Sequence, residues 1–140
     1  MSYLLDTNVL SELRRPALAD PRVVRWAQGQ DASRHFISVL TVMEIERGIV
    51  KKERTDAPAG AVLRKWFDDN VLARFAERTI PVDRLIARLS AQLRSPDPLP
   101  GNDSIIAGTA IMHGLTVVTR NTKHFEPTGV PLVNPWEFTG

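Results

Sequence analysis

The chain has 140 residues, of which 43% are hydrophobic and 24% are charged, and it contains no long polar or repetitive tract. This balance excludes a disordered chain and predicts one globular domain over residues 1–140. No apolar run approaches the roughly 20 residues that cross a bilayer, and no signal-peptide pattern opens the chain, so we expect a cytoplasmic protein without membrane contact.

Cysteine is absent, which excludes disulfides and thiolate metal sites and suits a reducing compartment. Any metal ion must therefore be held by oxygen or imidazole. The formal net charge is only +2, but 14 of the 18 basic residues are arginine, whose planar guanidinium pairs with phosphate through two parallel contacts. This composition is compatible with a nucleic-acid partner, and equally with arginines that only keep a small protein in solution.

The start of the chain predicts a strand, a turn and two helices. The apolar run Tyr3–Leu5 predicts a strand that ends at Asp6, after which Thr7 and Asn8 can cap a helix. Asp20, with a proline directly after it, predicts the first turn of a second helix.

The middle of the chain predicts a second strand over residues 35–39. A helix is then expected to begin near Thr41 and to end near Gly48 or shortly after. Residues 51–54, with the sequence KKER, predict a solvated connection to a further helix over residues 59–75.

The last part of the chain continues this alternation. We predict a third strand over residues 78–80, a helix capped by Asp83 and a breaker over residues 95–101. A helix is then expected from Asn102 or Asp103 to His113, closed by a left-handed Gly114. A strand over residues 116–119 and a short edge strand over residues 130–133 follow. Strands that alternate with helices predict an α/β domain with a mainly parallel central sheet flanked by helices.

Four oxygen-bearing side chains lie at the ends of predicted elements. Asp6 ends the first strand, Asn121 follows the strand over residues 116–119, and Glu44 and Asp103 each lie in the first turn of a helix. Ligands of parallel sheets bind beyond the carboxyl ends of the strands, so we expect Asp6 and Asn121 at the same edge. Hard oxygen ligands suit Mg²⁺ or Mn²⁺, and metal-assisted phosphodiester hydrolysis is the reaction they indicate.

Each of these residues has a structural alternative. Glu44 and Asp103 can simply face the positive end of a helix, and Thr41 with Glu44 fits a capping box. Asn121 can start a turn, whereas a carboxylate such as Asp6 at the end of an apolar strand is costly unless it is capped or paired. Position favours structural roles for the three histidines, His35, His113 and His124.

Four blocks of sequence follow one another along the chain: LDTNVLSE at residues 5–12, SVLTVME at 38–44, NDSIIA at 102–107 and TVVTRN at 116–121. Together with VNPW at residues 133–136, they resemble the PIN-domain ribonucleases, in particular the VapC-type toxins of bacterial toxin–antitoxin modules. The resemblance covers essentially the whole chain and implies a PIN-like three-layer α/β/α fold.

By this resemblance, Asp6, Glu44 and Asp103 are three acidic residues of a metal site, and Asn121 occupies a fourth position that is often aspartate in relatives. The implied cofactor is Mg²⁺, with Mn²⁺ as a possible substitute, ligated by Asp6 and Asp103. Glu44 would bind the ion or orient the attacking water as a base. Residues that would position the site through hydrogen bonds are Thr7 or Asn8, and Thr119.

The resemblance also implies partners. These are an RNA substrate, a cognate antitoxin that blocks the site, a second copy of the chain in a homodimer, and operator DNA bound only through the antitoxin. Two other functions stay open. One is a phosphohydrolase with Asp6 as nucleophile, although Asn8 stands where such an enzyme needs an acid/base aspartate. The other is a catalytically silent PIN scaffold that binds RNA or protein, which Asn121 leaves possible.

Overall fold

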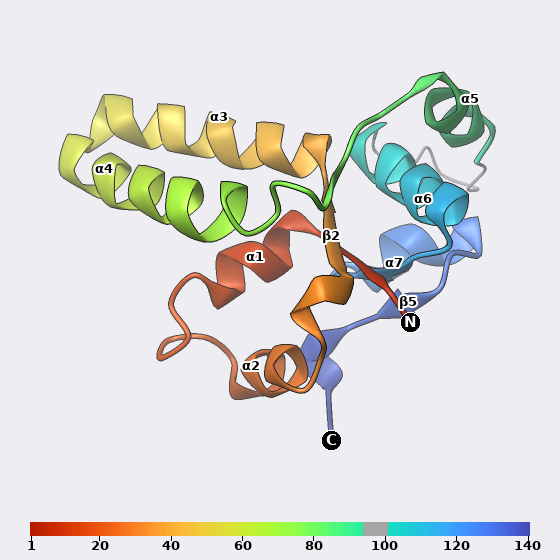
Figure 1. The fold of residues 1–140 in the computed structure, drawn as a ribbon, viewed down its shortest axis with the longest axis horizontal. Helices are drawn as coiled ribbons and strands as arrows, with labels where there is room; N and C mark the ends of the chain where they lie inside the picture. Colours follow the sequence, from red (N-terminus) through yellow and green to blue (C-terminus); the bar gives the residue numbers. More distant parts are fainter. Residues whose placement is uncertain (94–100) are drawn as a thin grey trace.

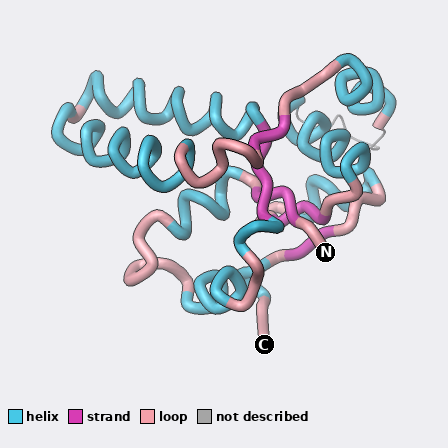
Figure 2. The backbone as a smooth tube through the Cα atoms, viewed as in Figure 1, coloured by secondary structure: helices cyan, strands magenta, loops and turns pink. Residues whose placement is uncertain are grey.

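The computed structural model describes residues 1–93 and 101–140, and its centre is a sheet of five short parallel strands (Figures 1 and 2). The strand order is β3-β2-β1-β4-β5, so β1 lies in the middle and β5 at an edge. The strands are β1 (Tyr3–Leu5), β2 (His35–Ser38), β3 (Thr79–Ile80), β4 (Thr116–Val118) and β5 (Leu132–Val133). All four pairings are parallel, which confirms the predicted parallel sheet.

Helices cover both faces of the sheet because its central strands are apolar on both sides. Leu4 and Val117 point into one hydrophobic cluster, and their neighbours Leu5 and Val118 point into another. The first cluster is closed by α5 (Arg84–Gln92), α6 (Gly101–His113) and α7 (Thr122–Phe125). The second is closed by α1 (Thr7–Leu13), α2 (Pro21–Gln28), α3 (Val39–Thr55) and α4 (Ala57–Trp66). The predicted three-layer α/β/α arrangement is confirmed.

Aspartate caps start most of these helices. The carboxylates of Asp20 and Asp83 accept hydrogen bonds from backbone amides of α2 and α5, as predicted. At α1 the cap is Asp6 itself, whose carboxylate accepts from the amide of Thr7, so the prediction that Thr7 or Asn8 caps this helix is wrong. Such a cap stabilises a helix by about 1 kcal/mol, and here it also fixes the carboxylate at the end of β1.

The structure corrects the prediction for α3. Ser38 caps this helix at 3.1 Å from the amide of Leu40, and the helix continues past Gly48 to Thr55, so residues 51–54 are not a connection. A glycine inside a helix costs about 1 kcal/mol, but Ile45 and Ile49 on either side are buried in the core and outweigh it. The proposed capping box is therefore also wrong, because Thr41 lies inside the helix and is fully buried.

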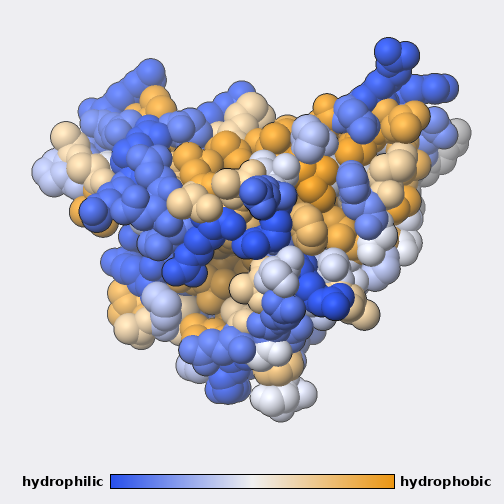
Figure 3. Space-filling view, viewed as in Figure 1, coloured by the Kyte–Doolittle hydropathy of each residue, from blue (hydrophilic) through white to orange (hydrophobic). Residues whose placement is uncertain are grey.

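α3 and α4 form an antiparallel pair that extends from the sheet (Figure 1). Asp56 ends α3 and caps α4, where its carboxylate lies 3.1 Å from the amide of Ala59. Arg64 of α4 pairs with Glu46 and Glu53 of α3. Figure 3 shows hydrophilic side chains over the outer end of this pair, and more hydrophobic surface toward the middle of the molecule.

The other predicted boundaries shift by a few residues. The helix predicted over residues 59–75 begins at Ala57 and continues from α4 into a π-helical turn, η2 (Phe67–Leu72). The left-handed Gly114 is confirmed at φ 65°, and α6 begins at Gly101. Short 3₁₀ turns are η1 (Ala32–Arg34), η3 (Glu126–Thr128) and η4 (Pro135–Glu137).

The predicted breaker over residues 95–101 falls, apart from Gly101, outside the described residues. None of the described helices has the length and apolar character needed to cross a membrane.

Candidate metal centre

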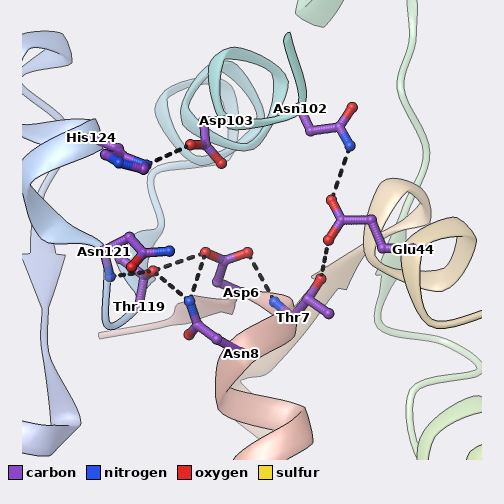
Figure 4. Close-up of polar contacts among 9 residues, drawn as sticks. All are labelled: Asp6, Thr7, Asn8, Glu44, Asn102, Asp103, Thr119, Asn121 and His124. Carbon is purple, nitrogen blue, oxygen red and sulfur yellow. Dashed lines mark hydrogen bonds and ion pairs between the residues drawn. The ribbon is translucent and has the colours of Figure 1, made fainter. Parts of the chain in front are cut away.

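All four predicted site residues line one open pocket of about 670 Å³ at the carboxyl edge of the sheet. Asp6 follows β1, Glu44 lies in the second turn of α3, Asp103 lies in the first turn of α6, and Asn121 directly precedes α7. The close-up in Figure 4 shows that these side chains come from four separate parts of the chain and surround a common space. The topology therefore brings the predicted residues together.

Asp6 is a buried carboxylate, only 8% exposed, in the middle of this group. One oxygen accepts a 2.9 Å hydrogen bond from the amide of Thr7, and the other accepts a 2.8 Å bond from the hydroxyl of Thr119. Burial raises the pKa of Asp6, the two hydrogen bonds oppose the rise, and the charges of Asp103 and Glu44 add to it. A bound cation would remove this electrostatic cost.

Thr119 and Asn8 connect the end of β4 to the start of α1. The side-chain amide of Asn8 lies 3.3 Å from the hydroxyl of Thr119, which also accepts a 3.1 Å bond from the amide of Asn121. The side-chain oxygen Oδ1 of Asn8 accepts a 3.3 Å bond from the backbone amide of Arg120. The predicted positioning roles of Thr7, Asn8 and Thr119 match these contacts, which hold Asp6 and residues 119–121 in fixed relation.

Glu44 has a polar partner at each carboxylate oxygen. The hydroxyl of Thr7 donates a 2.8 Å bond to one oxygen, and the side chain of Asn102 donates a 3.1 Å bond to the other. Glu44 is the sixth residue of α3, so it does not cap the helix, and the prediction that it lies in the first turn is wrong. The arrangement suits a carboxylate that is held in place to orient a ligand or a water molecule.

Asp103 has a partner that the sequence did not indicate. His124 places Nδ1 3.2 Å from a carboxylate oxygen of Asp103, although position alone favoured a structural role for this histidine. A signal was available, because His124 lies only three residues after Asn121, in the segment that leaves the carboxyl end of β4. The contact of Asn102 with Glu44 was also missed. Both contacts join parts of the chain that are far apart in the sequence.

Asn121 does not use its side chain as a helix cap. It directly precedes α7, yet no side-chain capping bond forms there within the described residues, and its side chain lines the pocket. The alternative that Asn121 only starts a turn therefore gives no role to its side-chain oxygen. The other two histidines differ: His35 is buried against Trp26, and His113 lies in the last turn of α6.

The chemistry of the donors fits a hard divalent cation, because three carboxylates and one amide face the same pocket. Among the described residues, however, no three acidic or histidine side chains already converge as a complete ligand set. Like charges repel when no cation separates them, and here hydrogen bonds hold each acid to a different neighbour. A cation bound in this pocket would offset that repulsion.

The family comparison agrees with the fold and the site. The PIN domain model matches residues 3–129. The chain is 36% identical to VapC ribonuclease Y4jK of Sinorhizobium fredii, over 96% of this chain and 97% of that protein. It is also 36% identical to Toxin FitB of Neisseria gonorrhoeae, over 95% of this chain and 97% of that one.

A solved structure gives the same result in three dimensions. The structure of FitAB bound to an IR36 DNA fragment superimposes with a TM-score of 0.85 at 34% identity, covering 99% of this chain and 98% of the matched chain. The family model, the relatives and the fold all span nearly the full length. The chain therefore belongs to the PIN-domain family, and along its whole length it is similar to the VapC-type toxins within that family.

Proposed function

We propose that this protein is a divalent-cation-dependent endoribonuclease and the toxin of a toxin–antitoxin module. The observation that carries the proposal is that Asp6, Glu44 and Asp103, from three distant elements, all line one pocket at the carboxyl edge of the sheet. Similarity over nearly the full length to proteins named VapC ribonuclease and Toxin FitB supports the same activity here.

Mg²⁺, or Mn²⁺ in its place, would be held by Asp6 and Asp103. The ion would supply charge neutralisation at the phosphate and at the leaving oxygen. Thr119 and the amide of Thr7 orient the carboxylate of Asp6. Glu44, fixed between Thr7 and Asn102, would bind the ion as a third ligand or accept the proton of the attacking water. Asn121 would add an oxygen without adding charge.

The direct test is cleavage of mixed RNA by the purified protein with Mg²⁺, with and without a chelator. We expect cleavage only with the free cation, and its loss in Asp6→Asn and Asp103→Asn, which keep the side-chain shape. Asp68→Asn removes an exposed carboxylate outside the pocket and serves as the matched control. Full activity in either site variant would disprove the assigned roles.

The same assay separates the two alternative functions. RNA binding without cleavage under any divalent cation would identify a catalytically silent scaffold. Release of phosphate from small phosphomonoesters, without cutting of RNA, would identify a phosphohydrolase. The residue at position 8 disfavours the latter, because the side-chain amide of Asn8 cannot act as a general acid or base near neutral pH and instead donates to the hydroxyl of Thr119.

The proposed partners are an antitoxin, a second copy of the chain, and operator DNA reached through the antitoxin. The matched FitAB structure contains a DNA fragment, which supports a complex of this kind. Coexpression with the product of the adjacent reading frame should give a complex that co-purifies and cleaves no RNA. Release of activity after proteolysis of the partner would confirm that it blocks the site, and an active intact complex would contradict it.

A further inference from the structure

Three arginines line the same pocket as the acids: Arg14, Arg15 and Arg120. Within residues 1–93 and 101–140, no carboxylate lies within ion-pair distance of any of them, whereas Arg22 and Arg64 are paired with acids. A guanidinium has five donors in a fixed plane, and these match the oxygens of a phosphate. The pocket thus combines carboxylates with three guanidinium groups that form no ion pair within the described residues.

Arg120 is held in place by two contacts. Its guanidinium lies 5.3 Å from the centre of the Trp136 ring, and its backbone amide donates to Asn8, which also contacts the hydroxyl of Thr119. Thr119 in turn donates to Asp6. The position of this arginine is therefore coupled to the carboxylate at the centre of the site, and an ordered side chain loses less conformational entropy when it binds a ligand.

Arg14 and Arg15 place two positive charges side by side where α1 ends. Arg14 is only partly exposed, and burial, together with the charge of Arg15, lowers its pKa. Bringing two like charges together is unfavourable unless an anion lies between or beside them. The carbonyl end of a helix favours positive charge but offers no anionic group, so a ligand with negative charge is the fitting partner.

We infer that Arg14, Arg15 and Arg120 form a subsite for phosphates that neighbour the scissile phosphate on one RNA strand. The inference rests on the proposed ribonuclease function and adds the part of the substrate that these residues contact. The subsite recognises the backbone, since Trp136 is 7% exposed and its ring is already covered by Arg120, so it offers no open face to a base. A substrate with only the scissile phosphate should therefore be poor.

Binding is measured first, in an Asp6→Asn background in which cleavage is switched off and asparagine can still cap α1. The probe is a fluorescent single-stranded RNA titrated over a range of KCl concentrations. We expect Arg120→Gln, and Arg14→Gln with Arg15→Gln, each to weaken binding about 5- to 10-fold and to lower the salt slope by about one per lost phosphate contact. Arg88→Gln, on the exposed face of α5, is the matched control.

One further variant and one further measurement separate the effect of charge from an effect on the fold. Arg120→Lys keeps the charge and loses the planar fork, so it should bind with an affinity between those of the parent and Arg120→Gln. Melting temperatures equal to that of the control show that the pocket is intact. Affinities and salt slopes equal to those of Arg88→Gln in every arginine variant would overturn the inference.

The second measurement uses the active protein. Single phosphates of an RNA substrate are replaced, one at a time, by neutral methylphosphonates. Replacement of a phosphate next to the cleaved bond should slow the wild-type protein severalfold and should have little further effect in Arg120→Gln, because the lost partners are the same. Equal slowing in both proteins overturns the inference. If the wild type cleaves no RNA, the proposed function is contradicted instead. The binding titrations then test by themselves whether the three arginines contact RNA phosphates.

Discussion

The hydroxyl of Thr119 lies 2.8 Å from a carboxylate oxygen of Asp6, a residue 113 positions earlier in the chain. Asp6 follows β1 and Thr119 follows the neighbouring strand β4, so the parallel pairing of these strands sets the distance. The bond is one of two short hydrogen bonds that offset the free-energy cost of burying the Asp6 carboxylate. It links the stability of the sheet edge to the geometry of the proposed metal site.

Replacing Thr119 by Val keeps the shape of the side chain and removes this hydrogen bond. We expect a loss of about 1–3 kcal/mol in the free energy of unfolding, because a buried carboxylate loses a donor, and a clear fall in RNA cleavage. Thr119→Ser should restore most of both. Denaturant unfolding and cleavage assays check this, and equal results for the Val and Ser variants would show that the hydroxyl is unimportant.

A divalent cation should stabilise the folded protein. Its binding relieves the repulsion that Asp103 and Glu44 exert on Asp6, and at 100 times the dissociation constant it adds about 2.7 kcal/mol. Melting curves with and without Mg²⁺ should show a shift that disappears in Asp103→Asn and persists in Asp68→Asn. If the shift persists unchanged in Asp103→Asn, Asp103 is not a ligand of the ion.

His124 should act as a positioning residue for Asp103. Its Nδ1 lies 3.2 Å from the carboxylate, so His124→Leu should weaken the binding of Mn²⁺ about 10-fold or more, as loss of such partners does in other metal sites. His124→Asn, whose side-chain nitrogen can take the place of Nδ1, should retain most of the affinity. Calorimetric titration with Mn²⁺ measures this directly, and equal affinity in the Leu variant would assign His124 no role at the site.

His35 should make the stability of the fold depend on pH. It stacks on Trp26 at 5.6 Å between ring centres, and its Nε2 has no hydrogen-bond partner among the described residues. Burial, followed by the charge of Arg78, lowers its pKa below the usual 6.5, while Asp31 opposes the change. The unfolded chain therefore binds a proton at His35 more readily than the folded chain does. The contribution of neutral His35 to the free energy of unfolding is complete above about pH 6.5 and is lost as the pH falls through the lower pKa of the folded state.

The expected slope is at most about 1.4 kcal/mol per pH unit between these two pKa values. Unfolding experiments from pH 7.5 to 5 should show it in the wild type, and His35→Phe, which keeps an aromatic ring, should lack it. Other titrating groups, Asp6 among them, contribute to both proteins, so only the difference between the two curves is diagnostic. Parallel curves would show that His35 does not lose a proton on folding.

Gly60 and Gly48 form a matched pair of helical glycines. A Cβ on Gly60 would lie 2.7 Å from the Cα of Glu53, whereas one on Gly48 meets nothing within 4 Å. Gly60→Ala should push α3 and α4 apart and destabilise the protein by about 1–3 kcal/mol, whereas Gly48→Ala should stabilise it by about 0.5–1 kcal/mol. Thermal unfolding of both variants is the measurement. A stabilising Gly60→Ala would mean that the two helices can separate freely.

Where structure depends on neighbouring residues, the sequence was sufficient at several helix ends, although the caps of α1 and α3 were predicted wrongly. Asp20 and Asp83 cap their helices and Gly114 adopts the left-handed conformation, because each effect involves only a few adjacent residues. The apolar runs around Leu4 and Val117 likewise predict strands that are buried on both faces, and hence the layered parallel fold. The end of α3 was predicted wrongly, since burial of Ile45 and Ile49 against distant elements outweighs the local preference of Gly48.

The site divides in the same way. Asp6, Glu44, Asp103 and Asn121 could be selected from motifs and from their places at element ends, and the structure puts all four in one pocket. The contacts of Glu44 with Asn102 and of Asp103 with His124, and the places of Arg14 and Arg15 beside them, could not be selected in this way. Sequence spacing carries information over a few residues, whereas such contacts span 21 to 58 positions and exist only after the parallel strands have brought their carboxyl ends to the same edge.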